Sequence, residues 1–119
     1  MLILLIVLVI VGLMYTLRSN DGKTIVEQRR DMVGKAQDVL LQSRLARIRE
    51  ALNLYFTDHG EYPDHLDLLV PDYIRNRLEI NDPWDKPFRL ERDETLTNII
   101  HSAGPDGSWD TKDDIWRQI

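Results

Sequence analysis

Residues 41–63, LQSRLARIREALNLYFTDHGEYP, contain both the buried face of a helix and the signals that end it. Large apolar residues recur here at intervals of four, three, four and three positions, which places them on one side of an α-helix. They are Leu41, Leu45, Ile48, Leu52 and Tyr55. The helix should end near Asp58, because Gly60 can adopt the left-handed conformation of a helix terminus and Pro63 cannot continue a helix. The pattern therefore predicts a long helix whose C-terminal half packs on a core.

The start of this helix is indicated by Thr24 and Glu27, which have the spacing of a capping box. A helix over residues 24–58 would be about 50 Å long, too long to be covered along its whole length by residues 59–119. We therefore expect its C-terminal half to carry a small domain and its N-terminal half to extend from that domain as a stalk.

The N-terminal part of the chain has a different composition. Residues 2–17, LILLIVLVIVGLMYTL, contain no charged side chain. As a helix they would rise about 24 Å, slightly less than the roughly 30 Å of bilayer hydrocarbon, and could span it with Tyr15 and Arg18 at an interface. No basic residue precedes the run and no small-residue cleavage pattern follows it, so a retained anchor is a better interpretation than a signal peptide. We predict a transmembrane helix over residues 1–18 and a separate domain over residues 19–119.

The residues that follow the apolar run give a signal about orientation. SNDG, residues 19–22, favours a turn. Four basic residues lie close to this turn: Arg18, Lys23, Arg29 and Arg30. By the positive-inside rule, this distribution on its own favours a cytoplasmic location for the polar part of the chain.

Composition excludes several classes of protein. The chain has 119 residues and a net charge of −5, and its acidity is concentrated in residues 106–114, which hold four Asp and one Lys. An acidic protein of this kind is unsuited to binding nucleic acid. The chain has no cysteine, which rules out a disulfide framework and a zinc–thiolate site.

No catalytic motif is present in the sequence. Asp58–His59 and Asp64–His65 are acid–base neighbours, but adjacent residues do not point at one reacting atom, and neither a nucleophile motif nor a phosphate-binding loop accompanies them. The chain is therefore predicted not to be an enzyme. His59, His65 and His101 lack the spacing of a helical metal site, so we expect them to be surface or turn residues. The three tryptophans are expected to pack the loop and the sheet.

The sequence that follows the long helix predicts only short helices and strands. Residues 65–74, HLDLLVPDYI, should form a second helix broken at Pro71. Residues 88–90 and 96–102 are two short apolar runs separated by polar residues, which predicts an antiparallel hairpin. Residues 115–116 would return as a third strand. The predicted fold class is α+β.

Residues 102–115, SAGPDGSWDTKDDI, combine closely spaced carboxylates with glycine and proline. Calcium takes about six to eight oxygen ligands, gathered by backbone that turns sharply. An EF-hand starting at Asp106 is excluded, because Thr111 stands at the position of its glycine and Arg117 at the position of its final glutamate. Two interpretations remain: an exposed acidic turn, or a cation site in which carboxylates from both ends of the loop converge.

Three segments resemble, in content and order, the major pseudopilin (the G-type subunit) of type II secretion systems, a member of the type IV pilin-like superfamily. They are ALNLYFTDHGEYP (51–63), NDPWDKPF (81–88) and SAGPDGSWDTKDDI (102–115). The resemblance covers roughly residues 35–117 and, in character only, the apolar N-terminus. It implies a long N-terminal helix with a transmembrane half and an amphipathic half, packed on a small antiparallel sheet. It also implies a calcium-binding C-terminal loop.

The calcium ligands of this family correspond to six residues of the present sequence. Three would contribute side-chain oxygens: Asp106, Asp113 and Asp114. Three would contribute backbone carbonyls: Ala103, Ser108 and Thr111. Asp110 has no assured counterpart in the family's ligand set and is expected to point to solvent.

The N-terminus departs from the pattern of the family. Its members normally have a basic leader ending in Gly, followed by a mature chain that starts with Phe or Met and has Glu at position five. Here Met1 is acceptable as a mature first residue, but Leu5 replaces the Glu that usually pairs with a neighbour's amino terminus during assembly. Tip-type minor pseudopilins also lack this Glu, so a specialised subunit is an alternative to the main one.

The resemblance implies a structural subunit that assembles with itself and with other pseudopilins into a short helical filament, at an inner-membrane secretion platform. It would be a single-pass protein of the bacterial inner membrane with its C-terminal domain in the periplasm, and Ca²⁺ would stabilise its C-terminal loop. One alternative is a monomeric membrane-tethered calcium-binding module. Another is a type IV pilin, which the absence of a C-terminal cysteine pair disfavours.

Overall fold

The computed structural model describes residues 1–18 and 24–119, so the turn predicted over residues 19–22 lies outside the described residues. The chain forms two compact units, Met1–Gly34 and Lys35–Ile119. The second unit contains the three described strands.

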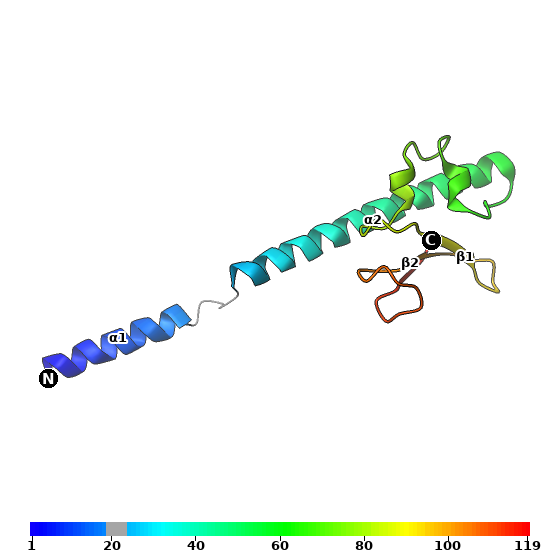
Figure 1. Ribbon diagram of the computed structural model, residues 1–119. Helices are drawn as coiled ribbons and strands as arrows, with labels where there is room; N and C mark the ends of the chain where they lie inside the picture. Colours follow the sequence, from blue (N-terminus) through cyan, green and yellow to red (C-terminus); the bar gives the residue numbers. More distant parts are fainter. Residues whose placement is uncertain (19–23) are drawn as a thin grey trace. The chain divides into compact units, whose positions relative to one another are not determined.

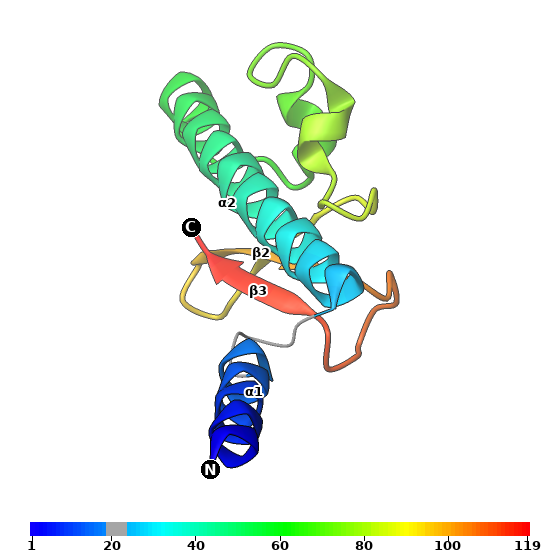
Figure 2. The same ribbon diagram turned by 90° about the vertical axis from the view of Figure 1, so that its left-hand side faces the viewer.

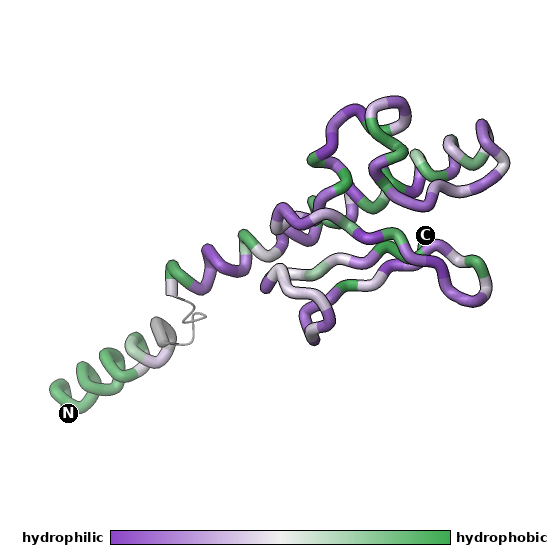
Figure 3. Tube along the Cα trace, turned by 45° about the vertical axis from the view of Figure 1, so that its right-hand side comes forward, coloured by the Kyte–Doolittle hydropathy of each residue, from purple (hydrophilic) through white to green (hydrophobic). Residues whose placement is uncertain are grey.

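The first unit contains helix α1, Leu2–Arg18, and the start of helix α2, Ile25–His59. The predicted capping box of α2 is confirmed: the Thr24 N–H donates to Glu27 Oε2 over 2.8 Å, and the Glu27 N–H donates to Thr24 Oγ1 over 3.3 Å. The residues of α1 from Leu2 to Tyr15 are exposed, and they form the green helical stretch in Figure 3. Within the part of the chain that the structure describes, no helix has both the length and the apolar character needed to cross a membrane. The membrane-spanning role of α1 stays a prediction.

In the second unit, α2 has one buried side, and the predicted apolar face is confirmed. Four of its five residues are buried: Leu41, Leu45, Ile48 and Leu52. The fifth, Tyr55, is partly buried and packs against the same core. The helix ends as predicted, because Gly60 has a φ of 77° and its N–H donates to the Phe56 carbonyl over 2.8 Å.

A three-stranded antiparallel sheet lies beside the C-terminal half of α2, as Figure 1 and Figure 2 show. Its strands are β1 (Arg89–Arg92), β2 (Asn98–Ser102) and β3 (Ile115–Gln118), in the order β1-β2-β3. Ile100 belongs to the apolar core that contains the buried face of α2. Successive side chains of a strand point to opposite faces, so His101 lies on the other face of the sheet. The predicted α+β class, the hairpin and the third strand are confirmed.

The segment between α2 and the sheet differs from the prediction. Residues 65–74 contain one 3₁₀ turn, η1 (Leu66–Leu69), instead of a second α-helix, and another 3₁₀ turn, η2 (Arg77–Ile80), follows without a counterpart in the prediction. Short isolated helices are only marginally stable, and here Leu69 and Ile74 are instead buried as separate anchors in the core. Burial of single side chains, rather than one helical face, fixes this segment.

Strand β1 begins one residue later than predicted because Phe88 belongs to the core. The Phe88 side chain is buried, and its N–H donates to the Ile80 carbonyl over 2.9 Å. At the other end of β1, Arg92 donates to the carbonyls of Tyr62 (2.9 Å) and Pro63 (3.1 Å). These two bonds fasten the turn that follows α2 to the sheet.

Candidate functional site

The sheet face opposite Ile100 carries a cluster of aromatic and charged side chains. Arg89, His101 and Trp116 are cross-strand neighbours on β1, β2 and β3. The His101 ring stacks on the Trp116 ring with centroids 3.3 Å apart. Trp109, from the loop between β2 and β3, meets the His101 ring edge-on at 4.8 Å, and its own ring centroid lies 3.7 Å from the Arg89 guanidinium. The loop therefore folds back onto this face of the sheet.

Asp114 closes this C-terminal loop, residues 103–114, against the cluster. Its side chain is only 4% exposed. Its Oδ2 lies 2.7 Å from His101 Nε2 and accepts from the Asp110 N–H over 2.9 Å. A carboxylate can only accept, so the ring nitrogen is the donor. The other oxygen, Oδ1, has one longer contact, 3.3 Å from Thr111 Oγ1.

The environment of Asp114 favours its ionised form. Burial alone would raise the pKa of this carboxyl, but the hydrogen bonds from His101 and from the backbone of Asp110 and Thr111 together bring that pKa below the ordinary value. The loop therefore holds Asp114 as a carboxylate.

The beginning of the loop is held by a second buried carboxylate, Asp82. Its Oδ1 accepts from the backbone N–H groups of Trp84 (3.0 Å) and Lys86 (2.9 Å). Its Oδ2 accepts from the Ser102 hydroxyl over 2.7 Å, and the same hydroxyl accepts from the Gly104 N–H over 3.1 Å. This buried chain of hydrogen bonds joins the turn around Asp82 to the first residues of the loop.

Gly104 allows the two ends of the loop to meet. Its φ is 68°, and a Cβ atom at this position would overlap the carbonyl oxygen of Asp113. Only glycine lacks that atom, so no other residue permits this backbone contact without a shift. The loop is thus closed at its backbone by Gly104 and Asp113, and at its side chains by two neighbours on β2, Ser102 and His101.

A solved structure is similar to this chain over most of its length. It is the crystal structure of the major pseudopilin from the type 2 secretion system of enterohaemorrhagic Escherichia coli, with a TM-score of 0.61 and 27% sequence identity. The match covers 74% of this chain and 91% of that one. The chain has the fold of a major pseudopilin. The resemblance inferred from the three sequence segments is confirmed, although no protein-family model and no curated protein matches the sequence.

Within this pseudopilin fold, the three carboxylates predicted to bind calcium have different environments. Asp106 is exposed, and its Oδ1 accepts from the Ser108 N–H over 2.9 Å. Asp113 is half-buried, whereas Asp114 is engaged by His101. Among the described residues, no three His, Asp or Glu side chains gather in a way that could hold a metal ion.

The backbone ligands predicted for calcium lie in the same loop. Ala103 is fully buried. The Ser108 carbonyl accepts from Thr111 Oγ1 over 3.3 Å, and the Thr111 carbonyl accepts from the Asp114 N–H over 3.3 Å. Both bonds are longer than ordinary hydrogen bonds. A carbonyl oxygen has two lone pairs, so each of these oxygens has a second lone pair besides the one that accepts the hydrogen bond. The loop thus offers carboxylate and carbonyl oxygens, which are the ligands that calcium takes.

The prediction that His101 is a surface or turn residue is wrong. Its side chain is 1% exposed, whereas His59 and His65 are exposed as predicted. Asp82 and Ser102, which hold the start of the loop, were not among the predicted site residues. An Asp before Pro in a turn-rich segment is typical of a side chain that caps backbone N–H groups, and this was the available signal for Asp82.

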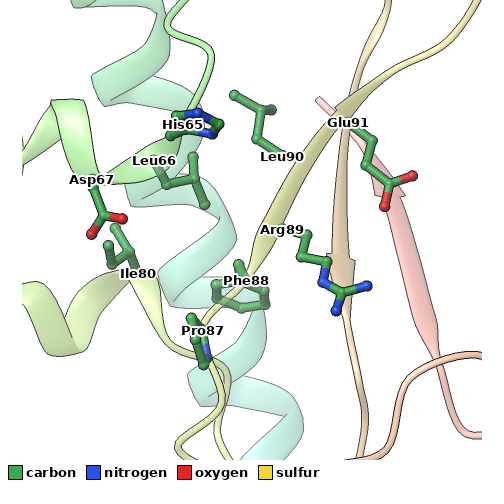
Figure 4. A pocket seen from close by; sticks show the side chains of 9 residues that line it. All are labelled: His65, Leu66, Asp67, Ile80, Pro87, Phe88, Arg89, Leu90 and Glu91. Atoms are coloured by element: carbon green, nitrogen blue, oxygen red, sulfur yellow. The ribbon is translucent and has the colours of Figure 1, made fainter.

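A separate depression of about 270 Å³ lies between η1 and β1 (Figure 4). Leu66 and Phe88 contribute apolar surface to it. The carboxylates of Asp67 and Glu91 lie on opposite sides in Figure 4, and Asp67 pairs with Arg77 at 2.6 Å. Side chains that do not converge on one point give no basis for assigning a reaction to this depression.

Proposed function

We propose that this chain is a structural subunit of a type II secretion pseudopilus, which assembles into a short helical filament that helps to export proteins. The observation that carries the proposal is the similarity in fold to a major pseudopilin, which covers 91% of that chain. The proposed partners are other copies of this chain, other pseudopilins and the inner-membrane secretion platform.

The exposed surface of α1 supports assembly from a membrane. Residues 2 to 15 are apolar and exposed, and a helix that is apolar on all sides needs lipid or other helices around it. Helices that leave lipid for a helical bundle exchange one apolar environment for another, so packing rather than water exclusion drives their association. The proposed location is the bacterial inner membrane, with a single span and the C-terminal domain in the periplasm.

The first turns of α2 offer a further surface for assembly. Four apolar residues are exposed there: Ile25, Val26, Met32 and Val33. In a filament, neighbouring helices would cover them and add directional packing to that of α1. A specialised minor or tip subunit is the alternative favoured by Leu5, since the usual Glu is absent at that position.

Crosslinking tests the filament. Because the chain has no cysteine, cysteines introduced between residues 3 and 14 report only the designed contacts. In membranes that contain the secretion partners, a filament predicts a ladder of crosslinked multimers, and electron microscopy should show short filaments. The same variants in membranes without those partners are the control for random collision. Monomers alone at every tested position would favour the monomeric tethered module.

We also propose that calcium binds in the C-terminal loop. The ligands would be the carboxylates of Asp106, Asp113 and Asp114 and the carbonyls of Ala103, Ser108 and Thr111. The support is the chemistry of these donors, which are oxygens from two ends of a loop already closed at its base. With calcium at ten times its dissociation constant, binding would stabilise the folded chain by about 1.4 kcal/mol.

Thermal unfolding of the full chain in detergent micelles tests the calcium proposal. The wild type should melt at a higher temperature in calcium than in chelator, and Asp113→Asn should remove that difference. Asp110→Asn is the matched control, because Asn tolerates the positive φ of 63° at this position and Asp110 is not a proposed ligand. Equal melting temperatures of the wild type in calcium and in chelator would refute calcium binding. The filament proposal would be unaffected, because the crosslinking experiment tests it separately.

A further inference from the structure

We propose that His101 is a positioning residue, which fixes the C-terminal end of the loop by holding Asp114 Oδ2 and thereby prepares Asp114 to bind calcium. The consequence for calcium rests on the function proposed above. The consequence for loop order does not, because it follows from the contacts of His101 with Asp114, Trp109 and Trp116.

His101 is itself held from several sides. Trp116 stacks on one face of its ring, and Trp109 meets the ring edge-on. Its Nε2 donates to Asp114 over 2.7 Å, and its Nδ1 lies 3.4 Å from Glu91 Oε1. A ring that is 1% exposed and contacted in this way has little freedom to rotate. It can therefore impose one orientation on the carboxylate that it contacts.

The two oxygens of Asp114 are used unequally. Oδ2 takes both short hydrogen bonds, from His101 (2.7 Å) and from the Asp110 N–H (2.9 Å). The contact of Oδ1 with Thr111 Oγ1 is longer, at 3.3 Å. A carboxylate that binds a metal through one oxygen is commonly held by hydrogen bonds to the other, and loss of that support weakens metal binding. His101 and the Asp110 N–H supply this support to Asp114.

The position of His101 in the sheet explains why it can act on the far end of the loop. Adjacent residues of β2 point to opposite faces, so Ser102 anchors the first residues of the loop through Asp82 while His101 anchors the last through Asp114. A loop that is fixed at both ends loses less conformational entropy when it binds a ligand than a loop fixed at one end.

Two substitutions at His101 separate its hydrogen bond from its ring. His101→Phe keeps an aromatic ring against Trp116 but removes the donor to Asp114, and His101→Gln restores an N–H donor on a side chain of similar reach. His59→Phe is the matched control, because His59 is exposed and its Nδ1 contacts only the Tyr55 carbonyl, at 3.0 Å, among the hydrogen bonds of the described residues. All variants are made in the full chain, in detergent micelles.

Two measurements follow. Hydrogen exchange in chelator should be faster for the amides of residues 103–114 in His101→Phe, while the buried face of α2 keeps its protection. Titration calorimetry with calcium chloride should give a dissociation constant about tenfold or more above the wild type for His101→Phe. His101→Gln should recover most of both properties, and His59→Phe should match the wild type.

The outcomes distinguish the two proposals. Unchanged exchange of the loop amides in His101→Phe overturns the positioning role, as does a calcium affinity equal to or tighter than that of the wild type. If the wild type itself binds no calcium, the calcium proposal fails. The positioning role of His101 is then decided by the hydrogen-exchange result alone. If His101→Phe unfolds globally, His101→Gln decides: a loop as protected as in the wild type supports the role of the donor, and an unprotected loop in a folded protein overturns it.

Discussion

The Ser102 hydroxyl donates a 2.7 Å hydrogen bond to Oδ2 of Asp82, a residue twenty positions earlier in the chain. Both side chains are fully buried, so water cannot replace either partner. The same hydroxyl accepts from the Gly104 N–H, and the start of the C-terminal loop therefore depends on this one side chain.

Ser102→Ala should lower the free energy of unfolding by about 1–3 kcal/mol, because it leaves a buried carboxylate oxygen without its donor. Urea unfolding of the full chain measures the change. Ser43→Ala, on the exposed side of α2, should alter the same quantity by no more than about 0.5 kcal/mol. A Ser102→Ala protein as stable as the wild type would contradict a structural role for this bond.

Gly104→Ala should be more destabilising than Gly60→Ala. Both glycines have positive φ, 68° and 77°, and a side chain in this conformation costs about 1–2 kcal/mol. At Gly60 an added Cβ meets nothing within 4 Å, whereas at Gly104 it overlaps the Asp113 carbonyl. Denaturant unfolding of the two variants compares them, and equal losses would show that the two ends of the loop are not in contact.

Leu96→Gly should stabilise the hairpin between β1 and β2. Leu96 is 77% exposed and has a φ of 61°, so it carries backbone strain with little burial to offset it. The gain in unfolding free energy should be about 1 kcal/mol, from relief of that strain less the greater flexibility of the unfolded chain. Leu96→Ala keeps the strain and is the control: a similar gain from alanine would assign the effect to the lost apolar surface.

Tyr73 should ionise at unusually high pH. Its hydroxyl donates to Asp58 Oδ2 over 2.7 Å, and this hydrogen bond, assisted by burial, raises the pKa of Tyr73 to about 12. A raised pKa in the folded state means that the bond contributes its full stability below the unfolded value of about 10 and loses it as the pH rises from there towards 12. Tyrosinate absorbance is measured against pH for the wild type and for Tyr73→Phe. The difference between the two curves gives the midpoint, the pH at which Tyr73 is half ionised.

Asp58→Asn should move that midpoint back towards about 10, because it removes the negative charge beside the hydroxyl. Asp64→Asn changes another exposed carboxylate nearby in sequence and should leave the midpoint in place. An Asp58→Asn protein with an unaltered midpoint would show that the Asp58 carboxylate is not the cause of the raised pKa.

Local patterns were sufficient to predict much of this fold. The apolar spacing of Leu41 to Tyr55 and the glycine at position 60 predicted the buried face and the end of α2, since periodicity and left-handed conformation are properties of short segments. The predictions were wrong where burial of single side chains replaced a regular pattern, as at Leu69 and Ile74, and at His101, which is buried and contacted by Trp109 and Trp116.

The sequence by itself determined the long helix, the hairpin and the composition of the C-terminal loop, because each depends on neighbours within a few residues. It also indicated the third strand, although that strand pairs with β2 across the loop. Only the tertiary structure decided that Ser102 meets Asp82 and that His101 meets Asp114. The reason is physical: β2 directs His101 and Ser102 to opposite faces, and what lies on each face depends on how the loop carrying Trp109 and the turn around Asp82 fold back onto the sheet.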